Sequence, residues 1–502
     1  MSPITPAQRT TVILSTLLAL FLGAMDALVV SATMPSVVAD LGGLALYSWV
    51  YSAYFLARAV SLPVFGKLAD LYRSRNLFLI AIAVFLAASA AAGAAGNMIA
   101  LIAARIVQGI GAGGIFALVY IVLADVSEPA LRGRTLSLAS SVWGIASVLG
   151  PTLGGFIVTY FSWRWIFFIN IPLGALSLWG VGVHFVETRP KKAHVTLDFL
   201  GVATLSTAIL ALLFAFMLGG RTVAWGSAPV AGLLAVFALG TAAFVWAENR
   251  AADPILSIGF FKIRAFSAGN GAVFLSSVAI FSLFAYAPLF IQGVQGKSPM
   301  AVGVAMLSLS LGWSLGALAL GRFIDRMGLK STAAAGAAVL VAGCAMTLGF
   351  SEGTGMAYSF SSFFIVGVGM GCVSLSTLLV VQSCVGPEDL GVATASNQFA
   401  RTLGGAVGVG ICGSFIATGF ARLESQMQAS GLLDRLPPHL KEGAAGHIER
   451  LLQPEAQALM PPALSRMLHE AVAASVTQVF WAVVVAAVLC LALCLLLPGR
   501  GR

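Results

Sequence analysis

The stretch that decides the fold is VILSTLLALFLGAMDALVVSATMP, residues 12–35. It is long and apolar enough to cross a bilayer, because about 20 apolar residues at 1.5 Å each span the hydrocarbon. Its one charged residue, Asp26, lies about 21 Å from the first face, past the midplane. A carboxylate at that depth is costly and is kept for pairing or for function. Either an arginine neutralises Asp26 for structure alone, or Asp26 takes up and releases protons on a transport path.

The composition identifies an integral membrane protein. Of 502 residues, 59% are hydrophobic and only 9% are charged, which is too little polar surface to cover a soluble globule of this size. The formal charge of +9 is spread over short loops and forms no single patch, so we expect no nucleic-acid partner. The six cysteines lie in or beside apolar runs without ligand spacing. We therefore expect apolar packing from them, with no metal site and no cofactor.

The rest of the chain repeats the pattern of the opening stretch. Apolar runs of about 18 or more residues alternate with charged or Gly/Pro-rich breaks. Backbone polar groups must be paired inside lipid, and runs of this length suit helices and not barrel strands. We therefore predict an all-α integral membrane protein with fourteen transmembrane helices. The approximate limits are 12–34, 47–69, 77–95, 98–122, 135–159, 164–186, 198–218, 228–247, 266–292, 301–323, 332–350, 357–381, 392–418 and 476–497.

The basic residues predict the orientation. An even number of spans puts both termini on one side of the membrane, and most of the 28 Lys and Arg residues lie in loops on that side. The short loops of the other side hold only Arg164, Arg221 and Lys297. Positive loops stay in the cytoplasm. We expect both termini to be cytoplasmic.

Two similar turns indicate an internal duplication. GKLADLYRSR (66–75) follows the second run, and GRFIDRMGLK (321–330) follows the tenth. Repeats of this kind are common in secondary transporters, whose binding site lies between the halves. We predict pseudo-symmetric six-helix bundles in residues 1–190 and 266–502, with two inserted helices and basic linkers in 191–265.

The second half contains one long polar segment, residues 419–475. Within it, LPPHLKEGAAGHIERLL (436–452) and MPPALSRMLHEAV (460–472) have the composition of short amphipathic helices that begin at prolines. We expect an extracytoplasmic loop. It either covers the outer mouth of the protein or is merely a tolerated insertion.

Arg105 in the fourth run lies near the depth of Asp26, and the two are the predicted proton-coupling residues. A nearby arginine favours the charged carboxylate, whereas desolvation favours the neutral one. Where the two effects nearly cancel, small rearrangements switch Asp26 between its forms. The alternative is a structural ion pair that faces the bundle interior.

Two further arginines lie within spans. Arg58 either pairs with Asp26 or attracts an anionic or zwitterionic substrate. Arg401 either faces the substrate or snorkels to the cytoplasmic interface. The residues expected to line the substrate cavity are Tyr54, Arg58, Gln292, Asn397 and Arg401.

Glycines and one proline in the fifth run indicate a site of bending. GIASVLGPTLGG (144–155) combines small residues at close-packing spacing with a proline that removes a helix hydrogen bond. Together with the two cytoplasmic turns, it supplies the residues expected to control conformational change. They are Gly66, Asp70, Arg73, Arg75, Gly150, Pro151, Gly154, Gly155, Gly321, Asp325 and Arg326.

These motifs together resemble one family. GAMDALVVSATMP (23–35) resembles the first-span signature of the fourteen-span drug:proton antiporters of the major facilitator superfamily. LIAARIVQGIGAG (101–113) is similar to their fourth-span motif, GIASVLGPTLGG to their antiporter motif, and GKLADLYRSR to their cytoplasmic turn. WRWIFFINIP (163–172) and PLFIQGVQGKSP (288–299) also look like this family, and the resemblance covers nearly the whole chain. The turn departs from the pattern, since Arg73 replaces its glycine and Ser74 its first cation.

The resemblance implies a proton-coupled exporter of small amphipathic compounds that works by alternating access in the bacterial inner membrane. Its partners would be the substrate, protons and the lipid bilayer, and its driving force the proton gradient. We expect a monomer, and leave open whether a periplasmic adaptor is used. The alternative is an exporter of a specific lipid, siderophore or other anionic or zwitterionic metabolite on the same fold, which Arg58 favours.

An enzyme is excluded on the residues. The five histidines lie in loops or at the end of the sixth run, and none is spaced as a partner of a nucleophile. The chain also has no phosphate-cradling loop.

Overall fold

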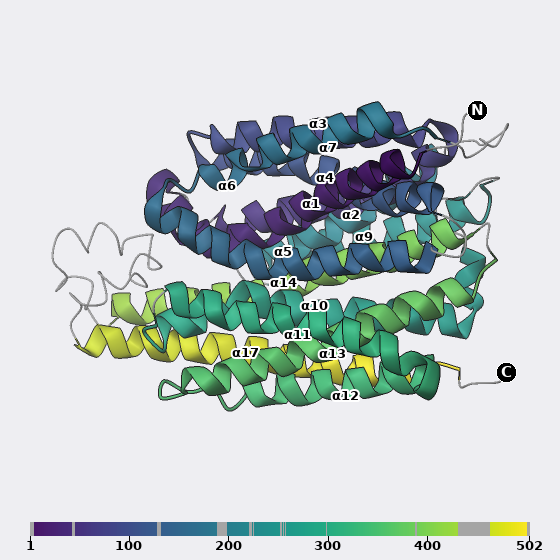
Figure 1. Cartoon of the computed structure of the whole chain (residues 1–502). Helices are drawn as coiled ribbons and strands as arrows, with labels where there is room; N and C mark the ends of the chain where they lie inside the picture. Colours follow the sequence, from purple (N-terminus) through teal and green to yellow (C-terminus); the bar gives the residue numbers. More distant parts are fainter. Residues whose placement is uncertain are drawn as a thin grey trace.

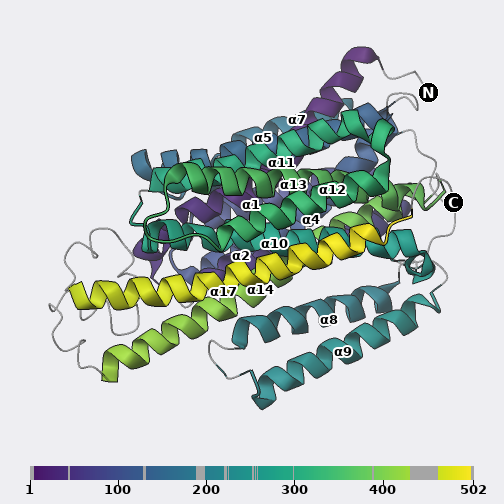
Figure 2. The same ribbon diagram turned by 90° about the horizontal axis from the view of Figure 1, so that it is seen from below.

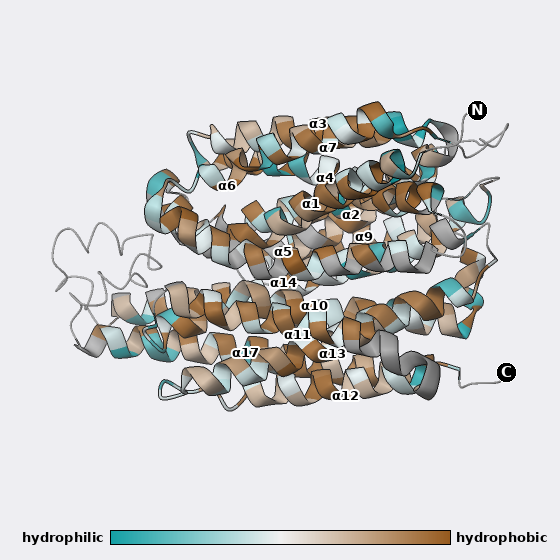
Figure 3. Ribbon diagram, in the orientation of Figure 1, coloured by the Kyte–Doolittle hydropathy of each residue, from teal (hydrophilic) through white to brown (hydrophobic). Residues whose placement is uncertain are grey.

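The computed structural model describes residues 5–42, 46–127, 132–187, 198–219, 223, 225–251, 254, 256, 258–297, 299–386, 389–429 and 462–498. Across these ranges the elements are helices, without a β-strand, and a single isolated bridge joins Gly219 to Val223. The predicted all-α class is confirmed. Figure 3 shows why the helices form a membrane protein: hydrophobic residues cover most of their length, and hydrophilic residues gather near their ends.

The first group of helices occupies the upper part of Figure 1. Thr5 starts the first helix with a capping box to Gln8 and a following proline, and Asn97 caps the fourth with its side chain. The group comprises α1 (Pro6–Leu41), α2 (Tyr47–Leu71), α3 (Ser74–Gly93), α4 (Met98–Val126), α5 (Arg132–Tyr160), α6 (Trp165–Phe168) and α7 (Asn170–His184).

The second group lies below it in Figure 1 and is also packed mainly against itself. It comprises α10 (Arg264–Gly293), α11 (Pro299–Met327), α12 (Leu329–Thr347), α13 (Met356–Ser383), α14 (Leu390–Ala429) and α17 (Pro462–Leu495). The start of α1 and the end of α17 lie at the same end of the bundle.

The remaining pair, α8 (Phe199–Leu218) and α9 (Ala228–Glu248), lies beside the bundle, as Figure 2 shows. A short 3-10 helix, η3 (Ile258–Lys262), precedes α10. α8 packs against α9 and also against α2 and α14, so it contacts both groups. α9 is mostly exposed in the protein alone, which suits a helix that faces lipid.

Twelve helices in the described ranges are long and apolar enough to cross a membrane. α2 and α5 are not among the twelve, although they have 25 and 29 residues and pack along α4 and α1. The count of fourteen spans therefore stays a prediction, as do the predicted domain boundaries.

The structure describes helix at both ends of segment 419–475, and the extracytoplasmic loop itself stays a prediction. α14 continues to Ala429, and MPPALSRMLHEAV does not form a separate helix, because it provides the first turns of α17 from Pro462 onward. Proline is well suited to the first helical position, and residues 463–495 contain neither proline nor glycine to end the helix. The segment 436–452 lies outside the described residues.

The two groups meet along two pairs of helices, α5 with α11 and α2 with α14. Aromatic side chains form this contact. Trp143 of α5 stacks on Trp313 of α11, with ring centroids 6.0 Å apart and planes 18° apart. Phe55 of α2 meets Phe281 of α10 edge to face at 5.7 Å. This seam positions the second of the two sites described below.

Candidate functional site

Asp26 lies inside the first group and is completely buried. The Nη1 atom of Arg105, which is also completely buried, lies 2.5 Å from Asp26 Oδ2. Two charges removed from water in this way stabilise each other only when their geometry is good and their other polar atoms are also bonded. The structure thus brings together the two residues predicted for proton coupling.

Neutral polar side chains complete the surroundings of this pair. Gln108 donates to Asp26 Oδ1 over 2.9 Å and to Ser89 Oγ over 2.7 Å, and it accepts from Arg105 Nη1 over 2.7 Å. Asn170 donates to the same Asp26 oxygen and to Ser89, each over 3.3 Å. We call Asp26, Arg105, Gln108, Ser89 and Asn170 the acid network. It joins α1, α3, α4 and α7.

Arg105 is also supported from α2. Its Nε donates to the carbonyl oxygen of Val50 over 3.3 Å, and its guanidinium carbon lies 4.0 Å from the centre of the Tyr54 ring. Tyr54 is held in place by a 3.1 Å bond from its hydroxyl to the Gly23 carbonyl. Tyr54 therefore belongs beside the ion pair, whereas the sequence had suggested the substrate cavity.

Sequence reasoning missed Gln108, Ser89 and Asn170. A signal existed for Gln108, because it follows Arg105 by three residues and so shares its helix face. Asn170 interrupts the apolar segment WRWIFFINIP, which is a weaker signal. Ser89 lies among alanines, where a serine has no distinguishing pattern.

Arg58 does not pair with Asp26. The acid's ion pair within the described structure is with Arg105, and the Arg58 side chain is 2% exposed among aromatic rings. Its guanidinium carbon lies 4.7 Å from the ring centres of both Phe55 and Phe116. Its Nε and Nη1 atoms have no hydrogen-bond partner within the described residues. Cation–π contacts partly replace the lost water at this guanidinium.

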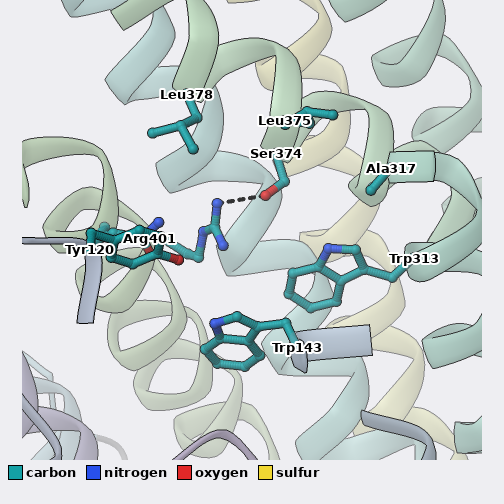
Figure 4. Close-up of a pocket in the computed structure, with 10 residues that line it drawn as sticks. Tyr120, Trp143, Trp313, Ala317, Ser374, Leu375, Leu378 and Arg401 are labelled. Carbon is teal, nitrogen blue, oxygen red and sulfur yellow. Dashed lines mark hydrogen bonds between the residues drawn. The ribbon is translucent and has the colours of Figure 1, made fainter. Parts of the chain in front are cut away.

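Arg401 lines a pocket between the two groups, as Figure 4 shows. Its Nη2 atom donates to Ser374 Oγ over 2.5 Å, and its side chain is only 7% exposed, so it does not snorkel to the membrane surface. The pocket is formed by α4 and α5 of the first group and α11, α13 and α14 of the second. Its lining residues are Tyr120, Trp143, Trp313, Ala317, Gly371, Ser374, Leu375, Leu378, Gln398 and Arg401.

Four of the five residues predicted for the cavity are not among the described residues that line this pocket: Tyr54 and Arg58, placed above, and Gln292 and Asn397. Gln292 stands one residue before the end of α10, which places it near a membrane face. Asn397 of α14 is completely buried, and neither atom of its side-chain amide has a hydrogen-bond partner within the described ranges. Position along the chain predicted their depth, but it did not predict the direction in which each side chain points.

The turn after α2 is tied to the far end of its own group. Arg75 donates to the carbonyl oxygen of Gly182, and the Ser74 amide donates to Glu187 over 3.2 Å. Arg73 is exposed, and a Cβ built on Gly66 would meet nothing within 4 Å. The structure describes no side-chain position for Asp70, Gly321, Asp325 or Arg326.

α5 is continuous through Pro151 from Arg132 to Tyr160. Gly150 lets it approach α1, since a Cβ there would lie 3.1 Å from Leu28 and 3.5 Å from the Met25 carbonyl oxygen. Gly154 is buried, and Gly155 faces open space. Gly150 thus packs against α1, the helix that carries Asp26. One of its contacts there, Met25, directly precedes Asp26.

The first group has an exposed ion pair at the end where α1 stops. Arg164 Nη1 lies 2.6 Å from Asp40 Oδ2, and the Trp163 indole donates to the same oxygen over 3.0 Å. The hydrogen bond from Arg164, and then that from Trp163, lowers the pKa of Asp40. The pair joins the end of α1 to the start of α6.

Comparisons with known proteins identify the family. Residues 16–409 match the model of the Major Facilitator Superfamily. Multidrug transporter protein MdtP of Bacillus subtilis (strain 168) is 31% identical over 469 residues, which cover 91% of this chain and 86% of that protein. Multidrug resistance protein 3 of the same organism is 30% identical over 494 residues, covering 98% of this chain and 95% of its own.

A solved structure shares the fold. It is the inward-facing, unoccupied form of a bacterial homolog to the human lysosomal transporter Spinster, with a TM-score of 0.60, 14% identity and 98% of each chain covered. The family match alone spans well over half of the chain. The chain therefore belongs to the Major Facilitator Superfamily, as a multi-pass membrane transporter of the efflux type and not an enzyme.

Proposed function

We propose that this protein is a proton-coupled exporter of small amphipathic compounds that works by alternating access. The observation that carries the proposal is the completely buried Asp26–Arg105 pair, to which the side-chain amides of Gln108 and Asn170 are hydrogen-bonded. An ionisable group inside the membrane is a candidate for proton transfer by default. The multidrug transporters among the relatives support the direction of transport and the kind of substrate.

Protonation of Asp26 would change the partners of Arg105. The neutral acid no longer balances the guanidinium, which keeps the Gln108 oxygen, the Val50 carbonyl and the Tyr54 ring as its remaining contacts. These last two belong to α2, and α2 packs against α14 of the other group. A change at the acid can therefore bias the contact between the two groups, and so the balance between the two open states.

A chain of contacts also leads from the acid network to the pocket. Tyr54 lies between Arg105 and Arg58, with its ring centre 4.0 Å and 5.7 Å from their guanidinium carbons. Arg58 stacks on Phe116, and Phe116 meets Trp143 of the pocket at 5.4 Å. We infer that substrate in the pocket and the proton on Asp26 influence each other along this route.

The predicted gating residues keep their proposed role. The Arg75–Gly182 contact and the turn containing Gly66, Asp70 and Arg73 lie on the side that we assign to the cytoplasm, together with both termini. The turn containing Gly321, Asp325 and Arg326 is its counterpart in the second half. We also propose the inner membrane as location and a monomer as the working unit.

The test is transport into inverted membrane vesicles, with a panel of labelled cationic and anionic compounds and with or without an uncoupler. Asp26→Asn should abolish pH-driven uptake while the protein remains in the membrane, and Arg105→Ala should show a comparable loss. Asp40→Asn is the matched control, because it makes the same substitution at an exposed acid of the same helix. Full pH-driven uptake by Asp26→Asn would defeat the proposal.

A second candidate is an exporter of an anionic or zwitterionic lipid, siderophore or other metabolite. It is favoured by Arg58, whose buried guanidinium contacts aromatic rings and has no ion pair within the described residues. Competition separates the two candidates. Anionic amphiphiles that block uptake better than cationic dyes of equal size would support the second.

A further inference from the structure

The membrane-embedded charges do not balance. Away from the ends of the predicted spans, the sequence contains three cations, Arg58, Arg105 and Arg401, and one carboxylate, Asp26. Three minus one leaves a surplus of two positive charges. Asp26 is engaged by Arg105, so the surplus belongs to Arg58 and Arg401. Buried cations of this kind need a counter-charge, and within lipid they mark binding sites.

Arg401 lines the pocket and has donor capacity left over. One of its nitrogens is bonded to Ser374, while its Nε has no partner within the described part of the chain. Among the described residues that line the pocket, none is acidic. A planar guanidinium with free donors is the side chain best suited to hold a carboxylate or sulfonate through two hydrogen bonds.

Flat aromatic rings form the pocket wall beside Arg401. Figure 4 shows its guanidinium and the indoles of Trp143 and Trp313 grouped around one space. The indoles are nearly parallel and come from opposite halves of the protein. Aromatic faces of this kind bind flat rings by stacking and by the apolar area that they bury.

Arg58 adds positive charge behind this wall. It contacts Phe116, which packs on Trp143, so one aromatic ring separates Arg58 from the indoles. A low-dielectric cavity that one cation lines, with a second cation behind its wall, attracts anions and repels cations.

We propose that the pocket binds aromatic monoanions, with the carboxylate or sulfonate on Arg401 and Ser374 and the ring against Trp143 and Trp313. This inference rests on the proposed export function for its biological meaning and names the substrate class of that function. The binding itself requires no proton gradient, so it can be measured separately from transport.

The experiment is equilibrium calorimetry on the purified full-length protein in nanodiscs of zwitterionic lipid. The probes are 2-naphthalenesulfonate and 2-naphthyltrimethylammonium, which share a ring and differ in the sign of charge. We expect the sulfonate to bind at least about 10-fold more tightly. Arg401→Gln should weaken sulfonate binding by about 10- to 100-fold, because it removes a charge-assisted hydrogen bond.

Three further variants keep the result interpretable. Arg401→Lys should recover part of the sulfonate affinity, since it keeps the charge and loses the planar fork. Trp143→Leu should weaken both probes by similar factors, because ring stacking does not depend on the sign of charge. Arg264→Gln removes an exposed arginine at the start of α10 and should change neither affinity.

The proposal is overturned if the ammonium probe binds as tightly as the sulfonate, or if a folded Arg401→Gln protein keeps full sulfonate affinity. If Arg401→Gln does not fold, the proposal is tested by the ratio of sulfonate affinity to ammonium affinity in the Arg401→Lys and Trp143→Leu proteins. A third outcome is weak sulfonate binding together with Asp26-dependent, pH-driven uptake of cationic dyes. It would show that the proposed substrate class is wrong while the proposed export function holds.

Discussion

Removing both charges of the central ion pair should restore stability without restoring transport. Asp26→Asn leaves the Arg105 guanidinium buried without its counter-charge, and Arg105→Gln does the same to the carboxylate. Breaking a buried pair from one side costs about 3–5 kcal/mol. The double variant Asp26→Asn/Arg105→Gln buries no charge at this point and loses only hydrogen bonds, so we expect it to cost about 1–2 kcal/mol.

The structure indicates which single variant is milder. After Asp26→Asn, Arg105 still contacts the Gln108 oxygen at 2.7 Å, the Val50 carbonyl at 3.3 Å and the Tyr54 ring at 4.0 Å. A desolvated cation–π contact contributes about 2 kcal/mol. We therefore place Asp26→Asn near the lower limit, at about 3 kcal/mol.

Unfolding is followed by helical circular dichroism while the purified protein is titrated from mild detergent into dodecyl sulfate. Transport of the same variants is measured in inverted vesicles. The double variant should unfold later than either single variant and should still lack pH-driven uptake, because it has no acid at position 26. If the stability losses of the single variants simply add in the double variant, the two charges are not energetically paired. If uptake returns together with stability, Asp26 has only a structural role.

Two predictions concern other parts of the molecule. Gly367→Ala should severely destabilise the protein, because the added Cβ would collide with the Leu309 carbonyl where α13 meets α11. Gly303→Ala is the control, since a Cβ there meets open space and should not change stability. Thermal unfolding in detergent compares the two variants. Asp40→Asn should lower stability slightly at neutral pH and not in acid. The hydrogen bond from Arg164, and then that from Trp163, lowers the pKa of Asp40, so the stability that the carboxylate contributes is present above its usual pKa and is lost as the pH falls through the lowered one. An equal difference between Asp40→Asn and wild type at all pH values would contradict this reasoning.

The central ion pair was predictable because charge within lipid is rare and depth follows from residue number. Counting 1.5 Å per residue placed Asp26 and Arg105 at similar depth, and the structure brings them into contact. The partner of Arg58 was not predictable in this way. Depth along a helix does not determine which neighbouring helix the side chain faces, and Arg58 turned out to face Phe55 and Phe116.

The amides of the acid network and the pocket could not be predicted from sequence patterns. Gln108 and Asn170 are neutral, so they stand out little within apolar runs, although both donate hydrogen bonds to the acid. The pocket joins side chains from five helices of both halves. Only the packing of those helices brings Trp143 to Trp313 and both to Arg401, and no local sequence pattern encodes that packing.

The surplus of two cations at mid-membrane has an electrical consequence. If the cargo is a monovalent anion, moving it out while one proton moves in transfers two elementary charges, so a membrane voltage of 100 mV would contribute about 4.6 kcal/mol per cycle. The same exchange with a monovalent cation would transfer no net charge and would feel no voltage. The sign of charge on the substrate that Arg401 accepts thus determines whether transport is electrogenic. It also determines whether the membrane voltage alone can drive transport when the pH inside and outside the cell is equal.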